Sequence, residues 1–385
     1  MRARIAVLAA AVLLLAACGS GNGDDKPADA GHPATTSPSS PATTAAAPKP
    51  LRAGERRVTV RMPSAYTPSA PTGVGTDDYR CFLLDPKVAK DSFITGFNVL
   101  PGSPDVVHHV ILFRVPPDLV AQAQQQDART PGEGWTCFGT SGLGNDGSID
   151  DAPWLGAWAP GGSEQLYGNG LGEPFTAGSR IIMQVHYNLL AGSEPDTSAA
   201  EIRLTSNPDT KALETRLLPA PVELPCRPGK GGDLCDREKA LADVRARFGD
   251  GPGSIANGLH LLCGGGPAGP TQSCTREVTS PETIRGVAGH MHLLGRSIRI
   301  EVNPGTPRAR TVLDIPVWDF DNQRSRPTPP IHLKRGDTIK VTCTHSQDLR
   351  DQLPAFATQR EDRYVLWGEG TTDEMCLGIL LVTRP

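Results

Sequence analysis

The sequence predicts an all-β protein made of two tandem antiparallel β-sandwich domains, and three observations support this class. Glycine (42) and proline (36) make up about a fifth of the 385 residues, which disfavours long helices and suits short strands joined by turns. Only residues 117–125 and 236–248 show a helical pattern. Short β-favouring runs alternate with turn clusters; they include residues 57–61, 92–100, 106–115, 180–190, 297–302, 338–342 and 377–383.

The second half carries a segment of different character. Residues 236–248 place alanine, leucine and valine at helical spacing, and Gly249 is a typical helix stop. Four cysteines, Cys226, Cys235, Cys263 and Cys274, surround this helix. We therefore expect a short helical insertion clamped by disulfides, with the pairing of its cysteines left open.

A turn cluster within residues 205–212 predicts the boundary between the domains. Dividing the chain there gives an N-terminal domain of residues 51–207 and a C-terminal domain of residues 208–385. Both have the size of an ordinary domain with its own core.

The N-terminus has the pattern of a bacterial lipoprotein. Arg2 and Arg4 precede an apolar run to residue 17 that is short for a membrane span and typical of a secretory signal. Residues 15–18 (LAAC) resemble a lipobox, so we expect cleavage after residue 17 and a lipid on Cys18; the alternative is an ordinary signal peptide. Residues 18–50 are rich in alanine, proline, threonine and serine, which predicts a disordered tether. We expect an extracytoplasmic protein anchored to the bacterial cell membrane through Cys18.

Charge and cysteine content narrow the possible functions. Lysine and arginine number 38 against 42 aspartate and glutamate, so the net charge of −4 argues against a nucleic-acid partner. Nine cysteines indicate an oxidising compartment. If Cys18 carries the lipid, eight remain, which suggests four disulfides.

Two close histidine pairs suggest metal ligands. Alternate residues of a strand share a face, so His290 and His292 can converge on one ion. Adjacent residues point to opposite faces, so His108 and His109 can share a metal only where the strand bulges. His186 lies in another predicted strand of the same half and could complete a three-imidazole site; otherwise one of the adjacent pair is a hydrogen-bonded core histidine.

The second pair needs a further ligand, and Met375 is the remaining candidate among five methionines. Met1 is in the leader, Met62 precedes a proline, and Met183 and Met291 have the opposite strand parity to the nearby histidines. Met375 lies beside Cys376, which could pin it through a disulfide, although a methionine near a chain end is often core. Two imidazoles and a thioether favour Cu(I), whereas three imidazoles suit copper or zinc.

At these residues the sequence resembles the copper type II, ascorbate-dependent monooxygenases, a family that includes dopamine β-monooxygenase and peptidylglycine α-hydroxylating monooxygenase. The resemblance covers roughly residues 55–384. Six motifs carry it in order: YRC at 79–81, VHHVILF at 107–113, LGAWAP at 155–160, MQVHY at 183–187, GHMHLLG at 289–295 and DEMC at 373–376.

The resemblance implies two sandwiches of jelly-roll type, each carrying one copper ion. His108, His109 and His186 would hold an electron-transfer copper, with Gln184 near it, and His290, His292 and Met375 would hold a catalytic copper across an interdomain cleft. It also implies the disulfides Cys81–Cys137 and Cys343–Cys376.

The activity implied by the resemblance is hydroxylation of a C–H bond in a small organic substrate, with O₂ and ascorbate or an equivalent reductant as co-substrates. Two positions depart from the family. Ala288 stands where the peptide-amidating branch has an arginine, and Ile379 where animal enzymes commonly have a tyrosine. Together the departures argue against peptide amidation and against a close copy of the animal substrate pocket, and they leave the substrate open.

Two other functions fit the same residues. One is a copper-binding or copper-buffering surface lipoprotein without turnover. The other is a zinc hydrolase that uses the three-histidine site. The sequence contains no nucleophile-elbow, phosphate-loop or HExxH motif that would favour a hydrolase.

Overall fold

The computed structural model describes residues 48–70, 76–143 and 154–385. All of them belong to one compact unit. The predicted signal peptide (residues 1–17), the lipid site Cys18 and nearly all of the tether (residues 18–50) lie outside the described residues.

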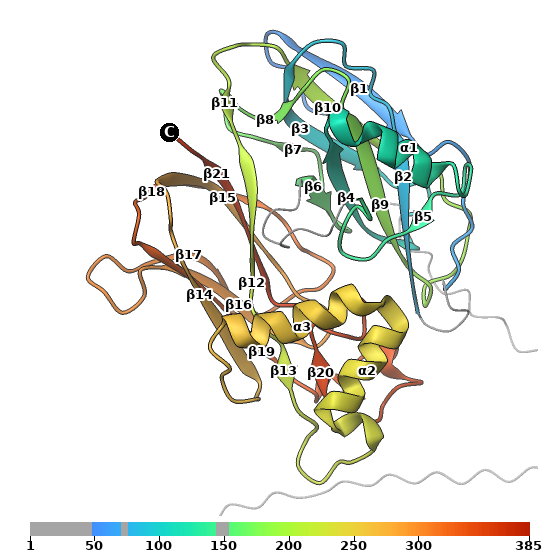
Figure 1. The fold of residues 1–385 in the computed structure, drawn as a ribbon, viewed down its shortest axis with the longest axis vertical. Coiled ribbons are helices and arrows are strands. Elements are labelled where there is room, and N and C mark those ends of the chain that lie inside the picture. The colour runs from blue at the N-terminus through green and yellow to red at the C-terminus, as the bar shows by residue number, and fades with distance from the viewer. Residues whose placement is uncertain (1–47, 71–75, 144–153) are drawn as a thin grey trace, which may run out of the picture. The chain divides into compact units, whose positions relative to one another are not determined.

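Two sheets form the N-terminal half (Figure 1). The first contains, in order, β1 (Glu55–Arg61), β10 (Ala199–Thr205), β3 (Ser92–Leu100), β8 (Leu171–Phe175) and β11 (Lys211–Ala212), with β7 (Gln165–Leu166) also paired to β3. The second contains β5 (Trp135–Thr136), β2 (Asp77–Leu84), β9 (Arg180–Asn188), β4 (Val107–Val115) and β6 (Trp154–Trp158). One apolar core, including Phe97, Leu112 and Val185, takes side chains from both sheets.

The C-terminal half repeats this plan with two four-stranded sheets. One contains β12 (Glu214–Pro219), β21 (Leu377–Thr383), β15 (Glu282–His290) and β18 (Arg326–Leu333). The other contains β14 (Thr271–Glu277), β19 (Thr338–His345), β16 (Gly295–Val302) and β17 (Arg310–Ile315), and a short pair joins β13 (Glu223–Leu224) to β20 (Val365–Leu366). Val287, Ile300 and Val341 belong to its core.

The prediction of a mainly β protein with antiparallel sheets is confirmed. Among the described strand pairs only β11 and β8 run parallel. Strands up to β11 pair with one another, and strands from β12 onward do the same, so the chain changes sheets between Ala212 and Glu214. A third apolar cluster, which contains Phe113, Leu217 and Trp367, draws on both halves and packs them together. The domain limits at residues 207 and 208 and the jelly-roll type stay predictions.

The insertion contains more helix than expected. α2 (Arg237–Phe248) occurs as predicted, and the Asp236 side chain caps it by accepting a hydrogen bond from the Lys239 amide at 3.0 Å. The expectation of a single helix there was wrong, because α3 (Asp250–Leu262) follows directly after Gly249. Its glycines lower helix propensity, but Ala256 and Leu259 are buried in the cluster shared by the two halves, and that packing outweighs propensity.

The remaining helices are short. α1 (Val120–Asp127) follows the 3₁₀ turn η1 (Pro117–Leu119), near the predicted helix at 117–125. Late in the chain lie α4 (Leu349–Gln352) and the 3₁₀ turn η4 (Pro354–Phe356), and η3 (Asp233–Cys235) precedes α2. No helix within the described ranges has the length and apolar character needed to cross a membrane.

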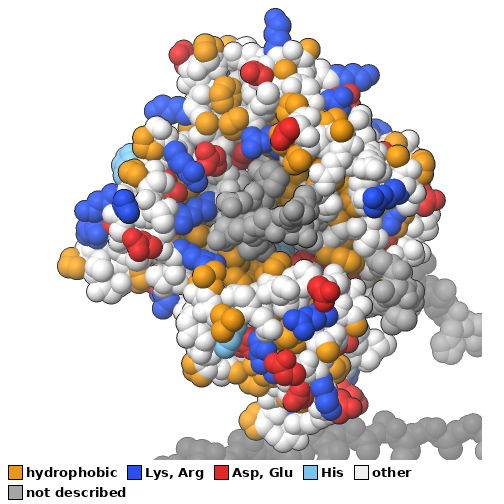
Figure 2. All heavy atoms as spheres, in the orientation of Figure 1, with side chains coloured by type: hydrophobic (Ala, Val, Ile, Leu, Met, Phe, Trp, Pro, Cys, Tyr) orange, Lys and Arg blue, Asp and Glu red, His pale blue; other side chains and the backbone are white. Residues whose placement is uncertain are grey.

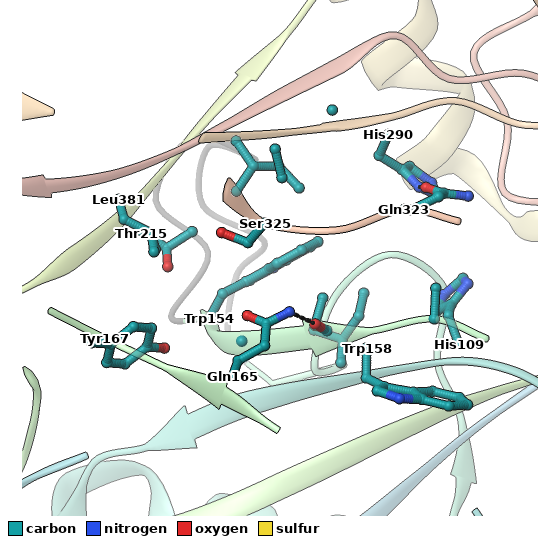
Figure 3. Close-up of a pocket in the computed structure, with 17 residues that line it drawn as sticks. His109, Trp154, Trp158, Gln165, Tyr167, Thr215, His290, Gln323, Ser325 and Leu381 are labelled. Carbon is teal, nitrogen blue, oxygen red and sulfur yellow. Dashed lines mark hydrogen bonds between the residues drawn. The ribbon is translucent and has the colours of Figure 1, made fainter. Parts of the chain in front are cut away.

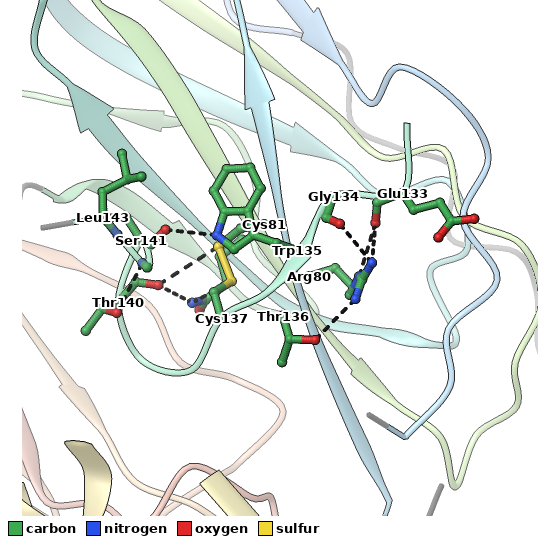
Figure 4. The surroundings of a disulfide bond; sticks show 12 residues. Arg80, Cys81, Glu133, Gly134, Trp135, Thr136, Cys137, Thr140, Ser141 and Leu143 are labelled. Carbon is green, nitrogen blue, oxygen red and sulfur yellow. Dashed lines mark hydrogen bonds between the residues drawn. A yellow bond between two sulfur atoms is a disulfide. The ribbon is translucent and has the colours of Figure 1, made fainter. Parts of the chain in front are cut away.

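Four disulfides link all eight cysteines of the described residues. Cys81–Cys137 and Cys343–Cys376 are confirmed. The open pairs resolve as Cys226–Cys235 and Cys263–Cys274, which clamp the insertion. In Figure 4, Cys81–Cys137 lies beside Trp135, whose indole N–H donates to the Ser141 carbonyl at 3.3 Å. This disulfide content indicates an extracytoplasmic protein.

The charged side chains agree with the balance of the composition. Figure 2 shows lysine and arginine interspersed with aspartate and glutamate over the face in view.

Candidate metal centre

Three histidines meet on two neighbouring strands, β4 and β9. The register shifts between Val107 and His109, so that Val107 lies opposite Tyr187 and His109 lies opposite His186. This irregularity is the bulge that adjacent histidines require if both are to face one ion. One ring nitrogen from each of His108, His109 and His186 lies within 4.8 Å of the others, and His109 Nδ1 is 3.1 Å from His186 Nδ1.

The orientation of His186 is set by groups around it. Its Nε2 is 2.8 Å from Asp77 Oδ1, and the Tyr79 ring stacks on the imidazole at a centroid distance of 4.0 Å. Burial opposes ionisation of Asp77, but the hydrogen bonds with His186 and Thr371 outweigh it and lower the pKa to about 2. A carboxylate on the far nitrogen of an imidazole is the usual arrangement for a metal-ligating histidine.

The protonation states of His108 and His109 fit a metal site. Burial first, and then the neighbouring imidazoles, hold the pKa of His108 and of His109 well below the usual range. Both ring nitrogens of His108 are buried and have no hydrogen-bond partner. A buried polar atom without a partner is costly, and a metal ion would remove that cost. The cluster His108, His109 and His186 could therefore hold a metal ion.

The second histidine pair converges as well, although not along one strand. His290 is the last residue of β15, and His292 lies just beyond the strand, with a ring-centroid distance of 5.1 Å between them. The His290 Nδ1 is 2.6 Å from Gln323 Oε1. Burial first, and then His292, lower the pKa of His290 to about 3. Burial also lowers the pKa of His292, whose Nδ1 is buried and unpartnered.

Met375 lies at the same place. Together with His290, His292 and His109 it lines a cavity of about 30 Å³. A volume above ~10–15 Å³ is enough for one water molecule, so a small ion or molecule fits there. The other candidate methionines are core residues, since Met62 and Met183 pack in the N-terminal core and Met291 in the C-terminal core.

The carboxylate of Glu374 organises this second set. It is fully buried, and it accepts hydrogen bonds from the backbone amides of His292 at 3.0 Å and Met375 at 3.2 Å. It also accepts from the Leu294 amide. His345 Nε2 lies 3.3 Å from Glu374 Oε2 and 3.3 Å from the Met375 carbonyl, which gives His345 a hydrogen-bonding role.

The two sets of side chains adjoin, which differs from the expected separation across a cleft. The rings of His109 and His290 are 6.0 Å apart. Phe320 of the C-terminal half stacks on His108 at 4.2 Å. Asp77 also accepts hydrogen bonds from the amide and hydroxyl of Thr371. The two halves therefore close over one continuous group of five histidines.

Gln184 lines the 30 Å³ cavity, as does Glu369. Gln184 is fully buried, and its amide donates to the Thr140 carbonyl at 3.0 Å. Burial first, and then the charge of Asp373, raise the pKa of Glu369 to about 8. The Glu369 carboxyl therefore keeps its proton at neutral pH.

A second cavity, which we call the inner pocket, begins at the same histidines. It has a volume of about 100 Å³, and its wall is mostly apolar. Figure 3 shows His109 and His290 at one end, with Trp154 and Trp158 along the wall. Ala288 and Ile379, the two positions that depart from the resembled family, also line it. The Trp154 indole N–H is buried without a partner.

Sequence reasoning missed the residues that position the histidines. Glu374 stands next to Met375 in the chain, so its place in the motif was a usable signal. Asp77 begins β2, and Gln323 and Phe320 lie in the loop between β17 and β18. These three have no spacing relation to the histidines, and only their contacts reveal their roles.

Comparisons with known proteins do not identify a family for this chain. No protein-family model matches the chain. No curated protein matches it either. A solved glycosylasparaginase, PNGase F from Flavobacterium meningosepticum, is similar over 86% of this chain and 96% of its own, with 10% identity and a TM-score of 0.32. An allantoicase structure covers 80% of this chain and 78% of its own at 11% identity, with a TM-score of 0.18. Similarity at this level carries no argument about chemistry.

Proposed function

We propose that this protein is a copper-dependent monooxygenase that hydroxylates a C–H bond of a small organic substrate, using O₂ and an external reductant such as ascorbate. His108, His109 and His186 would hold one copper ion, and His290, His292 and Met375 the other. The carrying observation is that the two predicted ligand sets, from opposite halves of the chain, adjoin: His108, His109 and His186 cluster together, and His109 lines one small cavity with His290, His292 and Met375.

The donor types favour copper over zinc. Four imidazoles with lowered pKa values, His108 and His292 buried and His109 and His290 half-buried, are in the neutral form that binds a transition metal. The thioether of Met375 is a soft donor that suits Cu(I) and adds little affinity for zinc. Bound copper would supply electron transfer and O₂ activation, with one oxygen atom entering the C–H bond and the other leaving as water after two electrons and two protons are delivered.

The protein groups have separate tasks in this reaction. The inner pocket would bind the substrate against His290 and exclude water through its apolar wall. Asp77 and Gln323 hold the imidazoles of His186 and His290 in fixed orientations. The carboxyl of Glu369, whose pKa is raised to about 8, lines the small cavity and would supply a proton there.

Metal analysis and oxygen uptake test the proposal together. We expect the purified protein to bind two copper ions per chain and to consume O₂ with ascorbate when a substrate is present. Two tightly bound copper ions without substrate-stimulated O₂ consumption would instead support a copper-buffering lipoprotein. Hydrolytic activity with zinc that persists in Met375→Ile would support a zinc hydrolase. The position of Ala288 and Ile379 in the inner pocket supports a reaction other than peptide amidation.

A further inference from the structure

A second compartment, which we call the outer vestibule, adjoins the inner pocket and differs from it in chemistry. Its volume is about 290 Å³. The two cavities share part of their walls, including Trp158, Gln323 and Leu381. Beyond the shared wall, Arg285 and Arg324 line the outer vestibule. A ligand that occupies both compartments would meet apolar side chains at one end and guanidinium groups at the other.

Neither arginine forms a salt bridge with any described residue. The Arg285 Nε donates to the Thr383 hydroxyl at 3.1 Å, and the Arg324 Nη2 donates to the Gly161 carbonyl at 2.7 Å. A guanidinium has five N–H donors, so each group keeps donors for a further acceptor. Neutral partners also leave the positive charge of each arginine uncompensated.

The acidic residue in the vestibule wall, Glu164, forms salt bridges with two other arginines. Glu164 is buried, and its carboxylate lies 2.8 Å from Arg57 and 3.1 Å from Arg203. Lys49 also lines the outer vestibule, and its ammonium group donates to the Glu164 carbonyl at 3.2 Å. The local balance of the described wall is therefore positive, which favours an anionic group in this compartment.

The chain connects both arginines to the second histidine set. β15 runs from the vestibule to the histidines, and Arg285 precedes His290 by five residues, which in a strand corresponds to roughly 16 Å. Arg324 directly follows Gln323, the residue that holds the His290 ring. A molecule with its anionic end at the arginines can therefore extend an apolar end toward His290.

We infer that the substrate is an amphiphilic organic acid, whose apolar chain enters the inner pocket and whose carboxylate binds Arg285 and Arg324 in the outer vestibule. This rests on the proposed function for the meaning of "substrate", although the binding itself does not require turnover. A carboxylate buried in the apolar inner pocket would lose hydration without compensation. At the vestibule it would instead form charge-assisted hydrogen bonds with the arginines.

Binding of matched eight-carbon probes to the metal-free full chain tests the inference. Octanoate, octanamide and octylamine share a chain and differ in charge, and the tryptophans of the inner pocket provide a fluorescence signal. We expect octanoate to bind about tenfold more tightly than octanamide and octylamine to bind most weakly. Acetate, which has the charge without the chain, should not displace octanamide.

Variants locate the effect. Arg285→Gln combined with Arg324→Gln should weaken octanoate about tenfold, to the level of octanamide, and leave octanamide unchanged. Arg299→Gln is the matched control, because Arg299 is an exposed arginine on β16 outside both compartments. A folding defect in the double variant would show as weaker octanamide binding. In that case the inference requires each single variant to weaken octanoate binding without weakening octanamide binding.

Three results would overturn the inference: equal binding of octanoate and octanamide to the unmodified protein, an octanoate preference that survives loss of both arginines, or no detectable binding of octanoate. Failure of the proposed function looks different, because the probes would bind as expected while the copper-loaded protein showed no reductant-dependent O₂ consumption.

Discussion

The two histidine sets are built in different ways. His108, His109 and His186 are held by a β-ladder, because β4 and β9 pair directly and a single bulge aims both adjacent histidines. His290, His292 and Met375 come from a strand end, a turn and a loop. The second set therefore depends on long-range contacts where the first depends on strand pairing.

Glu374 and Cys343–Cys376 supply those contacts. The carboxylate of Glu374 binds the amides of both His292 and Met375, and the disulfide ties the residue after Met375 to β19. This difference teaches that paired strands position ligand side chains precisely by themselves. A site built on loops depends for its geometry on the hydrogen bonds and disulfides that hold the loops together.

We call His290, His292 and Met375 the loop-built set, and the largest effect should come from removing its thioether. Met375→Ile should reduce substrate hydroxylation by more than about 100-fold, because a metal ligand is lost. Replacing a residue that only hydrogen-bonds a ligand typically costs about 10–100-fold. Copper on the three-histidine set should remain, so metal analysis should find about half the copper. Met62→Ile is the matched control, since Met62 is a core methionine and such a swap costs under ~1.5 kcal/mol. Unchanged hydroxylation in Met375→Ile would exclude Met375 as a ligand.

Removing each disulfide should separate stability from metal binding. Double Cys→Ser replacement at Cys343–Cys376 or at Cys81–Cys137 should each cost about 2–5 kcal/mol of unfolding free energy, measured by denaturant titration. Only the loss of Cys343–Cys376 should also weaken copper binding at the loop-built set. If the loss of Cys81–Cys137 weakened the three-histidine set equally, the distinction between ladder and loops would fail.

Replacing the outer carboxylates should have a smaller and more selective effect. Asp77→Asn should weaken metal binding at the three-histidine set about 10–100-fold, and Glu374→Gln should do the same at the other set. Titration with copper would measure each affinity. The comparison predicts that Glu374→Gln also lowers thermal stability more, because it disturbs three backbone amides, whereas Asp77→Asn disturbs one backbone amide and one hydroxyl of Thr371 besides the His186 imidazole.

The smallest effect on metal binding is expected at a contact between the halves that lies away from the metal centre. Burial raises the pKa of Glu173 to about 8, although the Thr215 hydroxyl donates to it at 3.2 Å. The pKa of Glu173 in the folded protein exceeds its unfolded value of about 4.5, so folding favours the neutral carboxyl. This contribution to stability is complete below about pH 4.5 and is lost as the pH rises from there to about 8.

Glu173→Gln removes this titration. From pH 5 to pH 9 the unmodified protein should lose about 4 kcal/mol of unfolding free energy through Glu173, and the variant should lose none through this position, as measured by denaturant titration at both pH values. An identical pH profile for the two proteins would show that Glu173 is ionised in the folded state. A change in copper binding would show that the interface at Glu173 also controls the metal centre.

Much of the fold was readable because the relevant patterns are local. Runs at 92–100 and 377–383 coincide with β3 and β21, since alternating or continuous apolar residues bounded by turn residues define strands directly. α3 was missed because its glycines argue against a helix, and only its packing on α2 and on the shared core stabilises it. The pairing of the insertion cysteines was likewise open, because several connectivities satisfy one spacing.

The sequence by itself indicated the six candidate ligands, the oxidising compartment and the β class, and the family resemblance added the two cysteine pairs Cys81–Cys137 and Cys343–Cys376. Tertiary structure decided how those residues meet. Contacts between segments far apart in the chain determine three features of the site. These are the bulge in β4, the hydrogen bonds from backbone amides to Glu374, and the approach of His109 to His290. Local sequence patterns report strand period and residue type, whereas such contacts are fixed only when both halves bury their common apolar surface.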